Sequence, residues 1–180
     1  FQDLWKRLNI SYDDFIRTTE RRHTDTVTWI LDYLNKKGDI YQDEYAGWYC
    51  VPCESFWTEA QLVEHTCPDC KRKVEHLSER NFFFRLSKYQ QWLIEYIKSH
   101  PDFIRPQSRR NEVLSFLELN ALCDLCISRP KERLSWGIAI PFSGDHVTYV
   151  WLDALINYIS AIGYSYDDTK FRKFWPVDIH

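Results

Sequence analysis

Two Cys-x-x-Cys pairs constrain this chain more than any other feature, Cys50-Val-Pro-Cys53 and Cys67-Pro-Asp-Cys70. Each pair contains a proline, a residue that favours tight turns, so the two sulfurs of each pair can face a common point. Four cysteine sulfurs at about 2.3 Å from one ion form the closed tetrahedral shell of a structural zinc site. The sequence therefore predicts that Cys50, Cys53, Cys67 and Cys70 hold a structural Zn²⁺ ion with no position left open for catalysis. Free buried thiols are the alternative.

Two other groups compete weakly for this role. Cys123-Asp-Leu-Cys126 has the same spacing, but it lacks a turn residue and stands among apolar neighbours. We expect these two cysteines to be small buried core residues, with an exchanged ligand set as the alternative. His65 precedes Cys67 by two residues and is a further, weaker candidate ligand.

Composition limits the class of protein. The chain has 180 residues, of which 44% are apolar, enough for one core and a small satellite domain. Its 23 basic and 26 acidic residues disfavour a surface that binds nucleic acid throughout, so contact with a polyanion would rest on local clusters such as Lys71-Arg-Lys73 or Arg105 with Arg109 and Arg110. Because the chain begins at Phe1 and has no Met, we expect it to be part of a longer protein.

The sequence also predicts the cellular compartment of the protein. No apolar run approaches the roughly 18 residues of a membrane span, so we expect no membrane partner. No secretion signal opens the chain, and paired Cys-x-x-Cys spacing indicates metal binding in a reducing compartment, which predicts a cytoplasmic protein.

Hydrophobic periodicity predicts alternating helices and strands, typical of an α/β fold that a metal-bearing insertion interrupts. Helices are expected over 24–38, 87–98, 110–122 and 153–162, and strands over 14–19, 81–86 and 147–150. Ser87 and Gln90 match the capping-box pattern at the start of the second of these helices.

One stretch, Tyr149-Val-Trp-Leu-Asp-Ala-Leu-Ile-Asn-Tyr158, closely resembles methionyl-tRNA synthetases, which are class I aminoacyl-tRNA ligases. Other stretches agree with this family in the same order: Phe15-Ile-Arg-Thr-Thr19, Gly38-Asp-Ile-Tyr41, Gly47-Trp-Tyr-Cys50, Asn81-Phe-Phe-Phe-Arg85, Arg110-Asn-Glu112, Ile127-Ser-Arg-Pro130 and Trp136-Gly137. The resemblance implies that 1–38 and 144–180 are parts of a Rossmann-type nucleotide-binding catalytic domain. It also implies that 39–143 is the family's connective-peptide insertion, with the zinc knuckles.

The resemblance implies a substrate site as well. Trp151, Ala154, Leu155 and Tyr158 correspond to the wall around the methionine side chain, and His180 to a family histidine near it. Helical spacing agrees, because Trp151, Leu155 and Tyr158 follow i, i+4, i+7 and share one face. Aromatic rings also gain about 0.3–1.5 kcal/mol from each contact with a thioether sulfur. Without the family resemblance, this row of apolar side chains would be interpreted as ordinary core.

Arg129 matches a catalytic arginine of the family that pairs with an active-site carboxylate outside this chain. A fixed guanidinium fork can hold that carboxylate and help neutralise phosphate charge. By itself, an arginine before a proline reads as a surface residue.

The implied activity is that of a methionine–tRNA ligase, which joins methionine to AMP from Mg²⁺-bound ATP and then to tRNA. Neither of the family's two ATP signatures, the His-Ile-Gly-His and Lys-Met-Ser-Lys-Ser types, occurs in the chain. We therefore expect that the chain alone does not form methionyl-adenylate. The main alternative is a stand-alone zinc-binding module that contacts RNA or protein, and a thiol-redox protein is a weaker one.

Overall fold

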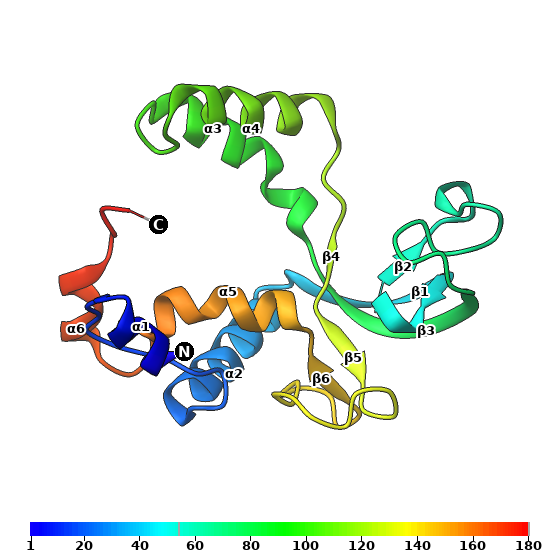
Figure 1. The fold of residues 1–180 in the computed structure, drawn as a ribbon, viewed down its shortest axis with the longest axis horizontal. Helices are drawn as coiled ribbons and strands as arrows, with labels where there is room; N and C mark the ends of the chain where they lie inside the picture. Colours follow the sequence, from blue (N-terminus) through cyan, green and yellow to red (C-terminus); the bar gives the residue numbers. More distant parts are fainter. Residues whose placement is uncertain (54, 180) are drawn as a thin grey trace.

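A computed structural model describes residues 1–53 and 55–179 of the chain. Figure 1 shows three groups of elements around a long β-ribbon: a group that contains the helices α1, α2, α5 and α6, a lobe at the end of the ribbon, and a projecting helical hairpin. The helices are α1 (Gln2–Arg7), α2 (Arg21–Lys36), α3 (Gln90–Ser99), α4 (Gln107–Leu119), α5 (Val150–Ser160) and α6 (Asp168–Phe174). Short 3₁₀ turns are η1 (Val51–Cys53), η2 (Glu59–Gln61) and η3 (Leu86–Tyr89).

The strands form two sheets. β1 (Ile40–Cys50) lies between β2 (Ser55–Trp57) and β3 (Glu75–Phe84), and β4 (Leu125–Cys126) follows beside β3. A second sheet pairs β5 (Ser128–Pro130) with β6 (His146–Thr148). Every strand pair among the described residues is antiparallel. A Rossmann sheet consists mostly of parallel strand pairs. No such parallel pair is formed within the described residues.

The strand predicted over 14–19 is wrong. This segment runs beside the start of α2 without a strand partner and closes in a turn, in which the Glu20 amide donates to the Arg17 carbonyl at 2.9 Å. The Glu20 carboxylate accepts from the Arg17 amide at 3.0 Å. The segment thus satisfies these backbone groups locally, whereas a strand needs a neighbouring strand to accept its hydrogen bonds.

The predicted helices are present with shifted ends. The helix α2 starts at Arg21, with Glu20 at the N-cap, and Gly38 follows its end with φ of +76°, a conformation that glycine adopts at little cost. The Ser87–Gln90 capping box is wrong. Ser87 Oγ donates to Asp124 at 2.6 Å, and the Gln90 amide donates to the carbonyl of Leu117 at 2.6 Å. These two side chains join α3 to the segment around α4.

Two apolar clusters hold the molecule together. The larger one is buried between α2, α5 and the strand junction and contains Val27, Leu31, Ile40, Ile127, Ile140 and Ile156. The smaller one, Ile94, Ile97 and Leu117, lies between α3 and α4. Ile156 on α5 packs into the larger cluster, so this face of α5 lies towards α2. The opposite face of α5 is therefore the exposed one.

A buried carboxylate links the end of α2 to the start of the helical hairpin. Asp39 is fully buried and accepts hydrogen bonds from Lys88 Nζ at 2.6 Å and from the Tyr89 hydroxyl at 2.5 Å, with Lys37 Nζ at 3.1 Å. Burial raises the pKa of this carboxyl, but the three donors outweigh burial and hold the pKa at about 2. Asp39 is therefore ionised in the folded chain over the whole neutral range.

Candidate functional site

The four predicted zinc ligands meet at the outer end of β1. Cys50 ends that strand and Cys53 lies in η1. Cys67 and Cys70 lie on a turn that closes when the Lys71 amide donates to the Cys67 carbonyl at 2.8 Å. The ligand sulfurs lie within 4.8 Å of one another, with 3.4 Å between the Cys50 and Cys70 sulfurs and 3.9 Å between those of Cys53 and Cys67. A tetrahedron of 2.3 Å bonds requires sulfurs about 3.8 Å apart, so the geometry fits zinc.

The charge state of the cluster also favours a divalent cation. Burial raises the pKa of Cys67, but amide hydrogen bonds from Cys70 and Asp69 outweigh it and lower the pKa to about 7. The hydrogen bond with Cys70, followed by burial, raises the pKa of Cys53 to about 12, and burial raises the pKa of Cys50. One thiolate forms easily, and further ionisation needs a cation to offset the accumulated negative charge.

The competing ligands lie elsewhere. Among residues 1–53 and 55–179, the four cysteines are the only cluster of three or more candidate ligands close enough to share an ion. His65 is exposed and does not belong to it. Cys126 is half-buried, but Cys123 is exposed, so the prediction of a buried thiol is wrong for Cys123. Its backbone lies in the open segment after α4, which explains the exposure.

The predicted substrate wall forms one exposed face of α5. Trp151, Leu155 and Tyr158 are 59%, 58% and 54% exposed, and Ala154, between them, is half-buried. Successive helical residues are rotated by about 100°, which places all four on one side and Ile156 with Ser160 on the other. The structure thus brings these four predicted residues together. His180, the fifth, lies outside the described residues.

Arg129 lies next to the start of α5 without being part of that helix. It is buried in β5, and its Nη1 donates to the Ser128 carbonyl at 2.9 Å and to the Cys126 sulfur at 3.1 Å. Its guanidinium lies over the ring of Tyr149, 3.8 Å from the centroid, and Tyr149 is the N-cap of α5. Such stacking fixes the plane of the guanidinium. Sequence reasoning missed this contact, because it depends on how β5 packs against the start of α5.

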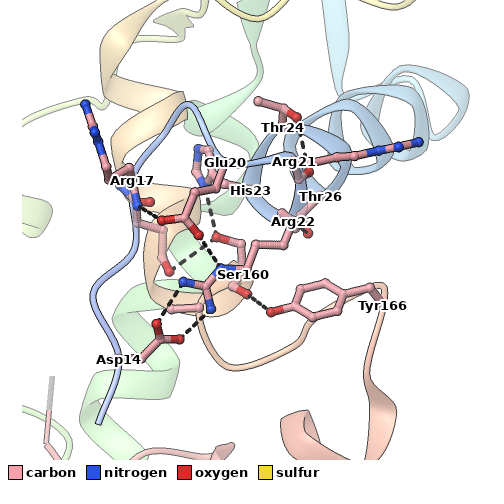
Figure 2. Close-up of polar contacts among 12 residues, drawn as sticks. Asp14, Arg17, Glu20, Arg21, Arg22, His23, Thr24, Thr26, Ser160 and Tyr166 are labelled. Carbon is pink, nitrogen blue, oxygen red and sulfur yellow. Dashed lines mark hydrogen bonds and ion pairs between the residues drawn. The ribbon is translucent and has the colours of Figure 1, made fainter. Parts of the chain in front are cut away.

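A polar row behind α5 was not predicted. His23, fully buried on α2, lies 2.6 Å from an oxygen of Asp153 through Nε2 and 2.8 Å from the Ser160 hydroxyl through Nδ1. Figure 2 shows His23 against Ser160 beside the bidentate pair of Arg22 with Asp14, whose distances are 2.5 and 2.8 Å. The sequence offers no signal for this row, because His23 and Ser160 stand 137 residues apart.

The basic clusters are partly engaged within the chain. Arg105 pairs with Asp102 at 2.8 Å, and Arg109 pairs with Glu112 at 2.6 Å. Arg110 donates to the Ile97 carbonyl at 3.2 Å at the end of α3. The last of these contacts joins α4 to the end of α3.

None of the helices in the described residues has the length and apolar character needed to cross a bilayer.

Comparisons with known proteins give a consistent result. The model of the family "tRNA synthetases class I (M)" matches residues 1–79 and 72–180. The methionine–tRNA ligases of Caldanaerobacter subterraneus and Clostridium acetobutylicum are 54% and 55% identical over 180 residues, 99% of this chain and 28% of each relative. A Mycobacterium tuberculosis methionyl-tRNA synthetase in complex with methionyl-adenylate has a TM-score of 0.84 at 42% identity, covering 98% of this chain and 35% of that one.

Proposed function

The chain belongs to the class I tRNA synthetases (M), and we propose that it is a segment of a methionine–tRNA ligase that carries one wall of the methionine pocket and a structural zinc lobe. The family resemblance predicted from the sequence is confirmed. The chain spans about 28% of the length of the curated relatives, so the activity proposed is that of the longer ligase.

The exposed face of α5 carries this proposal. A protein normally buries large apolar side chains, yet Trp151, Leu155 and Tyr158 form one contiguous face that the described chain leaves open. Two rings and an aliphatic group around Ala154 suit an unbranched thioether side chain, which gains from sulfur–aromatic contacts. The solved relative is in complex with methionyl-adenylate, which supports methionine as a substrate of the longer ligase. His180 is proposed to join the same pocket.

Arg129 supplies the adjoining charge. Its stacking on Tyr149 and its bonds to Ser128 and Cys126 hold the guanidinium at the first turn of the wall helix. We assign it the role of holding an active-site carboxylate and offsetting charge that develops on phosphate. ATP with Mg²⁺ and tRNA are the other proposed substrates of the ligase.

The chain's other regions are assigned accordingly. Residues 1–38 and 144–180 are proposed to belong to the Rossmann-type catalytic domain, and 39–143 to the connective-peptide insertion. Zn²⁺ held by Cys50, Cys53, Cys67 and Cys70 would stabilise the lobe, and the ligase would act in the cytoplasm. A stand-alone zinc-binding module is disfavoured, because the family match extends through both flanks of the lobe.

The test is methionine-dependent ATP–pyrophosphate exchange by the longer protein that contains this segment. Trp151→Ala should raise the KM for methionine about a hundredfold and leave the KM for ATP nearly unchanged. Trp92→Ala is the matched control, because Trp92 is also 59% exposed but lies on α3. An equal effect of both variants would refute the wall, and absence of exchange in the wild type would refute the ligase. The 180-residue chain alone should show no exchange.

A further inference from the structure

His23 contacts the wall helix from behind at two points. Asp153 and Ser160 stand seven residues apart on α5, which places them two turns apart on one face. The imidazole reaches both, at 2.6 Å and 2.8 Å, and Ile156 packs into the core on the same side of the helix. Contacts at two levels fix both the rotation of α5 about its axis and its axial position against α2.

The row cannot act as a nucleophilic triad. A Ser–His–Asp arrangement needs a hydroxyl that reaches a substrate carbonyl. Ser160 and His23 are both fully buried, and no part of either is open to a substrate. The carboxylate of Asp153, which is one-fifth exposed, is the outermost atom group of the row. The arrangement is therefore suited to holding the helix.

The hydrogen-bonding capacity of the three side chains agrees with a role in holding the helix. The ionised carboxylate of Asp153 only accepts, so Nε2 carries the hydrogen of that bond. In the neutral imidazole Nδ1 then accepts from the Ser160 hydroxyl, and all three side chains are satisfied. Such a fully satisfied buried row specifies one arrangement, because any rotation of α5 would leave a buried polar atom without a partner.

We propose that His23 is a positioning residue for methionine recognition: it sets the orientation of α5 and thereby of Trp151, Ala154 and Tyr158 on the opposite face. This inference rests on the proposed ligase function for its substrate, but its mechanical part concerns the chain alone. Asp153 adjoins Ala154 directly in sequence, so a turn of the helix that breaks the His23 contact also moves the wall.

Two substitutions separate the two contacts. His23→Gln can keep a donor near Nε2 for Asp153, whereas His23→Asn can keep only a group near Nδ1 for Ser160. The bond to the carboxylate is the charge-assisted one, so the Asn variant should be affected more than the Gln variant. Thr26→Val is the matched control: Thr26 is also fully buried on α2, but its hydroxyl bonds Tyr164 and Ser165 beyond the end of α5.

The first arm measures amide hydrogen exchange in the 180-residue chain. His23→Asn should accelerate exchange across α5 about tenfold or more relative to Thr26→Val at the same distance from each variant's melting temperature. Equal exchange in the two variants would overturn the mechanical part of the inference.

The second arm measures ATP–pyrophosphate exchange in the longer ligase. His23→Asn should raise the KM for methionine about tenfold, with His23→Gln showing partial rescue, while the KM for ATP stays within about twofold. Thr26→Val should leave both KM values unchanged. Parallel changes in both KM values, or none, would overturn the inference. An inactive wild type would instead refute the proposed function and leave the exchange result of the first arm valid.

Discussion

The four-cysteine lobe (48–76) and the α2–α5 body are joined by one continuous strand, β1, yet they bury different kinds of side chain. Strand β1 runs from Ile40, in the aliphatic core, to Cys50, in the sulfur cluster. Between positions 48 and 76, the buried hydrophobic side chains among the described residues are Cys50 and Cys67, both candidate ligands. The body instead buries Val27, Leu31 and their aliphatic neighbours.

This difference shows what each region depends on. A lobe that buries little except its four cysteines has too little apolar surface to offset the entropy of ordering, so we expect its folding to be coupled to metal binding. The body can fold on its core, and its polar contacts then select one arrangement of the helices. The two regions should therefore respond to different perturbations.

Removing a zinc ligand should have the largest effect, because structural zinc contributes about 10–16 kcal/mol of apparent binding free energy at pH 7. Cys50→Ser should lower bound zinc from about one ion per chain to near zero. Elemental analysis of freshly purified protein measures this directly. Cys123→Ser is the control and should retain the ion, and equal zinc loss in both variants would contradict the assigned ligand set.

A cavity in the body should come next. Leu31→Ala removes a fully buried side chain, so the free energy of unfolding should fall by about 2–5 kcal/mol, while zinc content stays at its wild-type value. Denaturant titration followed by circular dichroism gives the change. Leu119→Ala makes the same chemical change at a residue that is 80% exposed and should cost little. Loss of zinc in the Leu31 variant would show that the two regions are not independent.

Removing the charge of the buried Asp39 carboxylate should have a smaller effect. Asp39→Asn weakens bonds from Lys88 and Tyr89, so the free energy of unfolding should fall by about 1.5–3 kcal/mol at pH 7. The folded pKa of about 2 lies below the ordinary value of 3.8. Stability from this group is thus fully present above pH 4 and is lost as pH falls towards 2.

The Asn variant should lack that acid-dependent loss when unfolding is measured across this pH range. Asp25→Asn is its control, because the ion pair of Asp25 with Arg21 is exposed. A pH profile of the Asp39 variant identical to that of the wild type would contradict the assignment.

Sequence patterns predicted which side chains lie together better than they predicted the fold. The clustering of the four cysteines, and of the α5 residues on one helical face, was predictable because short spacings determine which side chains share a turn or a helical face. The long strand β1 was not, since its Gln-Asp-Glu stretch at 42–44 hides the alternation of a two-faced strand.

Contacts between distant segments also could not be predicted from local sequence patterns. The segment 14–19 has strand-like residues, but pairing depends on a neighbour that local sequence does not reveal. His23 with Ser160, and Arg129 with Tyr149, depend on how α2, β5 and α5 pack. Ser87 matched a capping box, yet its hydroxyl found Asp124 instead. A tertiary partner outweighed the local one in that case.

Hydrogen exchange over the whole chain, before and after removal of zinc by a chelator, tests the central contrast most directly. We predict that peptides from 48 to 76 lose protection, while those of α2 and α5 keep theirs. Protection that survives chelation in the lobe, or that disappears from both regions together, would contradict the account.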